Sequence, residues 1–153
     1  MANTHRIRSD FVEKVGQIAQ GEGLPKIAGR VFGLLMFDGE PISFGALATE
    51  LQVSRGSISS SVRLLEDRGV IKRVGVPGER QDFFQIADQP FTGLLEGALK
   101  RIKRAEQEIE ASLSELSIEA GATRDRLRSY SDFYKTLGGG LQHALSTVDD
   151  KKG

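Results

Sequence analysis

The strongest constraint on the fold is a change of hydrophobic periodicity along the segment from Ser43 to Ala87. Two short helical patterns come first, at about Ser43–Leu51 and Arg55–Arg68. Two short runs rich in β-branched or aromatic residues follow, VIKRV and DFFQIA, and the turn sequence GVPGERQ separates them. A period of about 3.6 residues indicates a helix, whereas short β-branched runs around a turn rich in glycine and proline indicate a hairpin. The segment therefore predicts two helices followed by a β-hairpin.

Further helical patterns lie on both sides of this segment. An amphipathic helix is predicted at about residues 9–20, and a second one begins at Pro25 and ends at the turn sequence DGEP. After the hairpin, Pro90 begins a long helix, and a second long helix covers about Thr123–Val148. With Ile42–Ser43 as a very short strand, this order is that of a winged helix-turn-helix. The expected fold is mainly α (α+β), with long helices flanking the winged helix.

The composition excludes several classes of function. Basic and acidic residues balance at 21 each, so the net charge indicates neither a nucleic-acid nor a membrane partner. The absence of cysteine excludes disulfides and thiol chemistry, and His5 and His143 lie at opposite ends of the chain, which does not suggest a metal pair. The N-terminus lacks the apolar core of a secretion signal, and no stretch reaches the roughly 18 apolar residues of a membrane span. We expect a cytoplasmic protein without metal or cofactor.

The serine-rich stretch SRGSISSSVRLLEDRG reads as a helix and not as a linker. Ile58, Val62 and Leu65 follow the i, i+4, i+7 spacing of an apolar face. Serine is a modest helix former, so packing and capping must stabilise this helix. Ser54 is the expected N-cap, with its hydroxyl accepting a hydrogen bond from the Ser57 N–H.

The opposite face of this helix is unusually short and uncharged, with Gly56, Ser59, Ser60 and Arg63. An ordinary surface helix would carry Glu and Lys there. Short side chains suit a helix that enters the major groove of DNA, where serine pairs with bases or phosphates and arginine pairs with guanine. The helix N-terminus also offers free N–H groups to a phosphate. The pattern therefore favours a recognition helix at about residues 55–68.

One segment of the chain resembles the winged helix-turn-helix of the MarR superfamily. Its sequence is PISFGALATELQVSRGSISSSVRLLEDRGVIKRVGVPGERQDFF. The GbsR-like branch of that superfamily begins the domain with a Gly-x-x-x-x-x-Gly-Arg helix similar to GLPKIAGRVFGLLMF, and the GER wing followed by aromatic residues is similar too. The resemblance covers Gly23 to about Phe84. Gln52 departs from it, because such motifs often have glycine in this turn, where the backbone is left-handed.

The resemblance implies a homodimer that binds a roughly palindromic operator. Some GbsR-like members respond to choline or related osmolytes, so the resemblance also implies a choline-like effector. A homodimer would present two recognition helices about 34 Å apart, one turn of DNA.

The segment from Ser54 to Gln81 is net positive within a neutral chain. Its hairpin turn, at about residues 75–82, is the expected wing, and Arg80 would contact the DNA backbone or the minor groove. The alternative for Arg80 is a solvated side chain paired with Glu79. The predicted DNA-contacting residues are Ser54, Arg55, Gly56, Ser57, Ser59, Ser60, Arg63, Lys72, Arg73, Arg80 and Gln81.

Apolar residues in both long helices recur at spacings of three and four, which is typical of a coiled-coil seam. Such a seam needs a partner, and a second copy of the chain is the simplest source. The predicted dimerisation residues are Phe11, Val15, Ile18, Leu95, Ile102, Ile109, Leu116, Leu127, Tyr134, Leu137 and Leu141.

Two features of the last helix allow more than one interpretation. Tyr130, Phe133 and Tyr134 would, with Phe11, line an aromatic pocket for a cationic effector such as choline, or they belong to the dimer core. The glycines at Gly138–Gly140 weaken a helix, and close packing at the dimer seam, a helix break or a hinge would each account for them.

These patterns divide the chain into a DNA-binding winged helix-turn-helix over residues 23–88, a helical dimerisation and effector region formed by residues 9–21 and 90–148, and a flexible tail at residues 149–153. The predicted function is sequence-specific binding of double-stranded DNA to regulate transcription. Phosphate-binding glycine loops, GxSxG motifs and Ser/His/Asp arrangements are absent from the sequence, so we expect no enzyme. The alternative is a winged-helix module for protein–protein contacts, which would carry apolar residues on the outward face of the serine helix.

Overall fold

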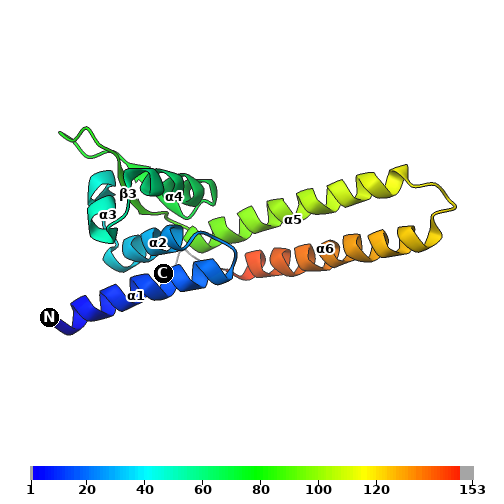
Figure 1. Ribbon diagram of the computed structural model, residues 1–153, viewed down its shortest axis with the longest axis horizontal. Helices are drawn as coiled ribbons and strands as arrows, with labels where there is room; N and C mark the ends of the chain where they lie inside the picture. The colour runs from blue at the N-terminus through cyan, green and yellow to red at the C-terminus, as the bar shows by residue number, and fades with distance from the viewer. Residues whose placement is uncertain (1, 149–153) are drawn as a thin grey trace. The chain divides into compact units, whose positions relative to one another are not determined.

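The computed structural model describes residues 2–148, so the predicted tail at residues 149–153 lies outside the described residues. The chain contains two compact units, Met1–Pro90 and Phe91–Gly153, which are described separately. Figure 1 shows its elements, which are α1 (Ala2–Gly21), α2 (Lys26–Asp38), β1 (Ile42–Ser43), α3 (Phe44–Leu51), α4 (Arg55–Asp67), β2 (Ile71–Val74), β3 (Phe83–Ile86), α5 (Pro90–Glu115) and α6 (Gly121–Thr147).

Helices α1 to α4 and a small antiparallel sheet build the first unit. The strand order is β1-β3-β2, and Ile42 of β1 lies opposite Phe84 of β3. Phe84 is fully buried, in a core that also contains Leu34, Leu47 and Ile58. The helix–turn–helix followed by a β-hairpin confirms the predicted winged-helix fold, mainly helical with a small sheet.

The ends of α3 and α4 follow the predicted capping rules. Ser43 and Ser54 are the N-caps, and the Ser54 hydroxyl accepts the hydrogen bond from the Ser57 N–H. Gln52, between the two helices, has the left-handed φ of 55° that the turn was expected to require. A non-glycine residue in this conformation costs about 1–2 kcal/mol, which the surrounding fold offsets.

Helix α1 begins at Ala2, whereas its apolar pattern predicted a start at about residue 9. Its first turns are polar and give no periodic signal, although Arg6 pairs with Asp10 one turn later, at 3.3 Å. The helix packs on α2 at Gly29, where a Cβ would lie 2.6 Å from the Cβ of Ala19. This close crossing places α1 in the same unit as the winged helix.

Helices α5 and α6 form an antiparallel hairpin. Arg124 of α6 donates hydrogen bonds to the carbonyls of Leu113 (3.4 Å) and Leu116 (2.8 Å), which caps the end of α5. Farther along, Glu110 of α5 accepts a 2.7 Å hydrogen bond from the buried hydroxyl of Ser131. Both long helices expected from the sequence are therefore present, and polar contacts set their register.

The three consecutive glycines lie within α6, which continues through them without a break. A Cβ on Gly138 would lie 3.5 Å from a side-chain carbon of Ile102, an ordinary contact, and a Cβ on Gly139 or Gly140 would meet nothing within 4 Å. The helix-break interpretation is therefore wrong, and close packing within the chain does not require these glycines.

Within residues 2–148, none of the helices is both long enough and apolar enough to cross a lipid bilayer. Histidine, aspartate and glutamate side chains do not gather there in groups of three or more that could hold a metal ion.

Candidate nucleic-acid interface

Helix α4 has two faces of opposite character. The predicted apolar stripe, Ile58, Val62 and Leu65, is buried in the core of the first unit. On the outward side, Gly56 and Arg63 are exposed. The buried stripe fixes the rotation of the helix about its axis, so the short outward side chains form a surface that another molecule can approach closely.

The serines of α4 have different surroundings. Ser54 and Ser57 hydrogen-bond to each other through their hydroxyls at 2.9 Å, which completes the N-cap. Ser59 accepts a long hydrogen bond of 3.5 Å from Arg63, whereas Ser60 is exposed. A groove of about 540 Å³ beside this end of the helix is lined by Pro25, Ile27, Ser54, Gly56, Ser57, Ser60 and Ser61. The sequence analysis did not identify Pro25 and Ile27 as part of this surface, because only the fold brings them beside α4.

Arg55 and Gln81 lie close to the start of α3. The Arg55 guanidinium lies 4.7 Å from the centre of the Phe44 ring. A guanidinium that stacks by its face keeps N–H donors at its edge, so Arg55 remains able to bind a phosphate. The side-chain oxygen of Gln81 accepts a 3.1 Å hydrogen bond from the Gly45 N–H, which fastens the wing to α3.

The two basic residues of β2 are engaged within the chain. Arg73 forms ion pairs with Glu66 of α4 at 3.0 Å and with Asp82 at 2.8 Å, and the hydrogen bond to Glu66 raises the pKa of Arg73. Lys72 pairs with Asp88 at 2.9 Å. Their prediction as DNA contacts rested on charge alone. Because neighbouring carboxylates neutralise both charges, the geometry favours a role in positioning the wing against α4.

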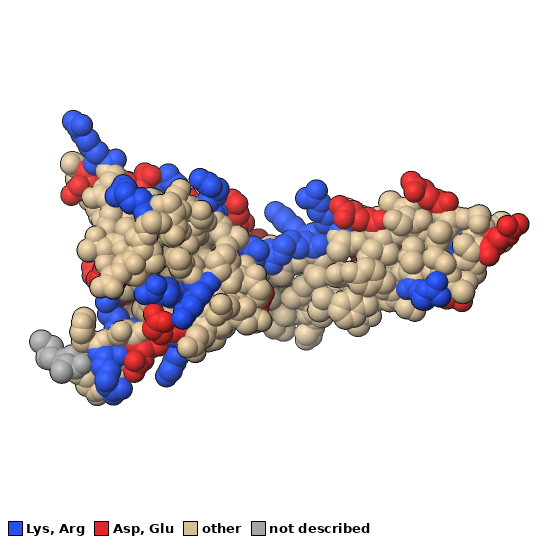
Figure 2. All heavy atoms as spheres, in the orientation of Figure 1, with Lys and Arg blue, Asp and Glu red and all other residues tan. Residues whose placement is uncertain are grey.

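Arg80 is placed differently from Arg73, in the exposed turn between β2 and β3. Gly78 in this turn has a φ of 83°, which glycine adopts without strain. Within residues 2–148 Arg80 makes no ion pair, with Glu79 or with any other residue. Figure 2 shows basic side chains projecting from the tip of this wing. The Arg80 guanidinium is thus available to a ligand.

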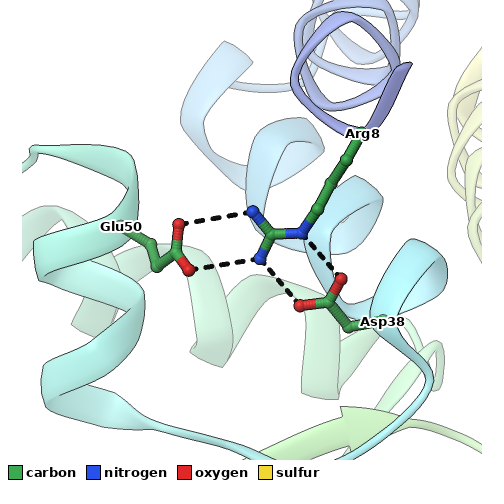
Figure 3. A network of polar contacts seen from close by, with 3 residues as sticks. All are labelled: Arg8, Asp38 and Glu50. Atoms are coloured by element: carbon green, nitrogen blue, oxygen red, sulfur yellow. Dashed lines mark hydrogen bonds and ion pairs between the residues drawn. The ribbon is translucent and has the colours of Figure 1, made fainter. Parts of the chain in front are cut away.

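A polar network that the sequence analysis missed holds α3 in place (Figure 3). Arg8 of α1 donates hydrogen bonds to both carboxylate oxygens of Asp38, each at 2.8 Å, and contacts Glu50 of α3 at 3.2 Å. The bond to Asp38 is the largest cause of the raised pKa of Arg8. From α2, Arg30 donates a 3.2 Å hydrogen bond to the carbonyl of Leu51, at the end of α3. These contacts fix α3, the helix that precedes α4.

The predicted dimerisation residues of α1 are partly used within the chain. Phe11 packs on Phe37 of α2, with ring centres 5.8 Å apart. Val15 lies at the crossing, 3.0 Å from where a Cβ on Gly33 would be. Ile18 is 59% exposed and so remains available to a partner.

The predicted effector residues form an aromatic cluster on α6. Tyr134 lies between Tyr130 and Phe133, with ring centres 5.1 and 5.3 Å away. The hydrogen bond with Tyr130 raises the pKa of Tyr134. Tyr130 and Phe133 are more than half exposed, and Leu137 is 39% exposed. The cluster belongs to the second unit and Phe11 to the first, where Phe37 already covers Phe11.

The remaining residues of the predicted seam are neither fully buried nor fully exposed. The most buried apolar side chains of the described part of α5 are instead Leu99 and Leu113. The half-buried seam residues are Leu95, Ile102, Ile109, Leu116, Leu127 and Leu141.

Residues 22–82, which run from the turn before α2 to the end of the wing, match the MarR family. The winged helix of this chain is therefore similar to that of the MarR family. Similarity to known proteins also extends beyond the winged helix. The transcriptional regulator MmpR5 of Mycobacterium tuberculosis (strain ATCC 25618 / H37Rv) is 28% identical over 145 residues, 94% of this chain and 88% of MmpR5.

Two further comparisons also find regulators of transcription. A crystal structure of a transcriptional regulator, 28% identical, superposes with a TM-score of 0.80 over 91% of this chain and 95% of that chain. The transcriptional repressor OpcR of Bacillus subtilis (strain 168) is 25% identical over 76 residues, 50% of this chain and 41% of OpcR. These relatives are regulators of transcription. This similarity to regulators agrees with the prediction that the chain is not an enzyme.

Proposed function

We propose that this protein is a MarR-family regulator, which controls transcription by binding double-stranded DNA in the cytoplasm. The observation that carries the proposal is the outward face of α4, where Gly56, Ser60 and Arg63 are short or basic and exposed. Helix α4 enters the major groove, and Arg80 of the wing reaches the backbone or the minor groove. The polar character of this face argues against the alternative, a protein-interaction module.

The proposed form is a homodimer on a roughly palindromic operator. Its support is the apolar surface that one chain leaves uncovered, including Ile18 of α1 and Phe133 and Leu137 of α6. Burial of such surface in a two-fold dimer pairs two winged helices, and their operator half-sites would lie about 34 Å apart.

A finer proposal concerns the branch and its effector. The sequence GLPKIAGRVFGLLMF is the basis on which we place the chain in the GbsR-like branch. The exposed rings of Tyr130 and Phe133 suit a quaternary ammonium such as choline. Choline should change the affinity for operator DNA in the full chain, and Tyr130→Ala should abolish the change. An equal response in that variant would contradict this effector site.

Selection of bound sequences from random duplex DNA tests the main proposal. We expect enrichment of a palindrome with half-sites one helical turn apart. Absence of any enriched sequence would favour the protein-interaction module.

Two arginine variants then separate the roles of α4 and the wing. Arg63→Ala should relax the preference at particular bases, because a bidentate arginine–guanine pair contributes about 1–3 kcal/mol of discrimination. Arg80→Ala should weaken binding to all sequences and reduce the slope of log K against log salt by about 0.9 per lost phosphate contact. Arg126→Ala, an exposed change on α6, is the matched control and should alter neither quantity.

A further inference from the structure

The densest cluster of positive charge in the chain lies on α5, in the second unit. Lys100, Arg101, Lys103 and Arg104 occupy four of five consecutive positions, and all four are exposed. Figure 2 shows basic side chains gathered on this helix. The proposed contacts of α4 and the wing do not involve any of them.

Two of these four cations, Lys100 and Lys103, carry charge that no ion pair within the described residues offsets. Arg104 pairs with Glu108 at 3.7 Å, and both side chains are largely exposed. Like charges three or four positions apart, as in Lys100 and Arg104, destabilise a helix. The stability of α5 therefore does not explain the cluster, whereas an anionic partner would.

The first unit has fewer available cations than its sequence suggested. Lys72 and Arg73 are paired with carboxylates, which offset their positive charges. The affinity of a protein for DNA depends strongly on the number of phosphates that it neutralises. Cations elsewhere in the chain would add to that number.

The surroundings of the cluster favour DNA over a lipid surface. A helix that lies on a membrane combines basic residues with exposed apolar ones that enter the bilayer. Ile102, the apolar residue within the cluster, lies against α6, where a Cβ on Gly138 would be 3.5 Å away. The exposed surface of the cluster consequently offers charge without an apolar anchor, which suits the phosphates of a nucleic acid.

We propose that Lys100 and Lys103 form a second DNA contact, which binds duplex phosphates independently of sequence. This inference rests on the proposed function, because it assumes that the protein binds DNA. It adds a contact from the second unit to those of α4 and the wing.

The test compares two double variants of the full chain on specific and scrambled duplexes over a range of salt concentrations. One variant is Lys100→Gln with Lys103→Gln, and the matched control is Lys14→Gln with Arg126→Gln, two exposed cations from other helices. Two lost phosphate contacts should lower the slope of log K against log salt by about 1.8 per protomer on both duplexes. The ratio of specific to scrambled affinity should stay unchanged, as should the slope of the control variant.

Three results would overturn the inference, and they have different meanings. If the unmodified protein binds DNA and the Lys100/Lys103 variant keeps its salt slope, the cluster does not contact DNA, although the proposed function stands. If that variant loses sequence preference, the cluster reads bases and not phosphates alone. If the unmodified protein binds neither duplex, the proposed function fails as well. Circular dichroism of both variants confirms that the helices are retained.

Discussion

The two units of this protein are stabilised in different ways. In the first unit, side chains from three helices and the sheet enclose Phe84, and the Arg8 network fastens α1 to the end of α2 and to α3. In the second, Leu99 and Leu113 are the buried apolar side chains of the described residues, and the register of the hairpin depends on polar contacts such as that between Glu110 and Ser131. The first unit has a complete core, whereas the second leaves large apolar side chains exposed.

This difference matches the two tasks of the proposed DNA-binding dimer. A surface that reads a groove must hold its side chains in fixed positions, so it benefits from a closed core beneath it. A surface that binds a second copy must expose apolar groups until that copy arrives. Substitutions in the two units should accordingly differ in whether their effect depends on protein concentration.

The largest expected effect comes from removing an aromatic side chain from the core of the first unit. Phe84→Ala should lower the free energy of unfolding by about 3–5 kcal/mol, because Phe84 is fully buried. Phe133→Ala is the matched change in the second unit, where the ring is 57% exposed. Its effect should appear as a weaker dependence of the melting temperature on protein concentration. Urea and thermal unfolding at several concentrations measure both, and equal, concentration-independent losses would contradict the comparison.

A glycine-to-alanine change should have opposite signs in the two units. At Gly29 the added Cβ would lie 2.7 Å from the carbonyl oxygen of Val15, so α1 must move, at a cost of about 1–3 kcal/mol. At Gly140 it meets nothing within 4 Å. Gly140→Ala should therefore stabilise α6 by about 1 kcal/mol through helix propensity. Thermal unfolding of both variants decides the matter, and a destabilised Gly140→Ala would indicate that the second copy packs on this glycine.

Features that depend on neighbours in the sequence were predictable. The N-caps at Ser43 and Ser54, the left-handed turn at Gln52 and the buried stripe of α4 all follow from local chemistry and periodicity, and the structure contains each of them. The order of these elements was sufficient to predict the winged helix.

Features that depend on residues far apart in the sequence were not predictable. The ion pairs of Arg73 gave no signal in the sequence, because Glu66 of α4 and Asp82 just before β3 become its neighbours only in the fold. Arg8 gave no signal, because Asp38 lies 30 residues away. The start of α1 was missed for a related reason, since its first turns lack an apolar stripe and their long-range contacts come from Arg8.

The next smaller effect concerns the ion pairs that connect the wing to α4. Arg73→Gln removes pairs with Glu66 and Asp82, and each such exposed pair contributes about 0.2–1 kcal/mol. If Arg73 positions the wing, the variant should bind DNA more weakly without a change in salt slope. Arg80→Gln should instead lower the slope and leave stability unchanged. Binding titrations at several salt concentrations distinguish the two, and a lowered slope in Arg73→Gln would restore it as a phosphate contact.

The smallest effect is a pH dependence in the second unit, centred on Glu110. The hydrogen bond from Ser131 is the largest cause that lowers the pKa of Glu110, and Arg128 and Lys135 act in the same direction. A carboxyl whose pKa is lower in the folded state contributes stability above its unfolded pKa of about 4.3 and loses it as the pH falls through the folded value. Glu110→Gln should therefore be less stable than the unmodified chain at neutral pH, and the difference should shrink at acidic pH.

The control for this prediction is Glu108→Gln, because Glu108 lies on the same helix and pairs only loosely, at 3.7 Å, with Arg104. Urea unfolding of the three proteins from about pH 7 to pH 3 measures the differences. A difference between the unmodified chain and Glu110→Gln that stays constant over this range would show that the hairpin does not depend on the charge of Glu110. In that case the Ser131 hydrogen bond alone would set the register of α5 and α6, because a neutral glutamine can still accept it.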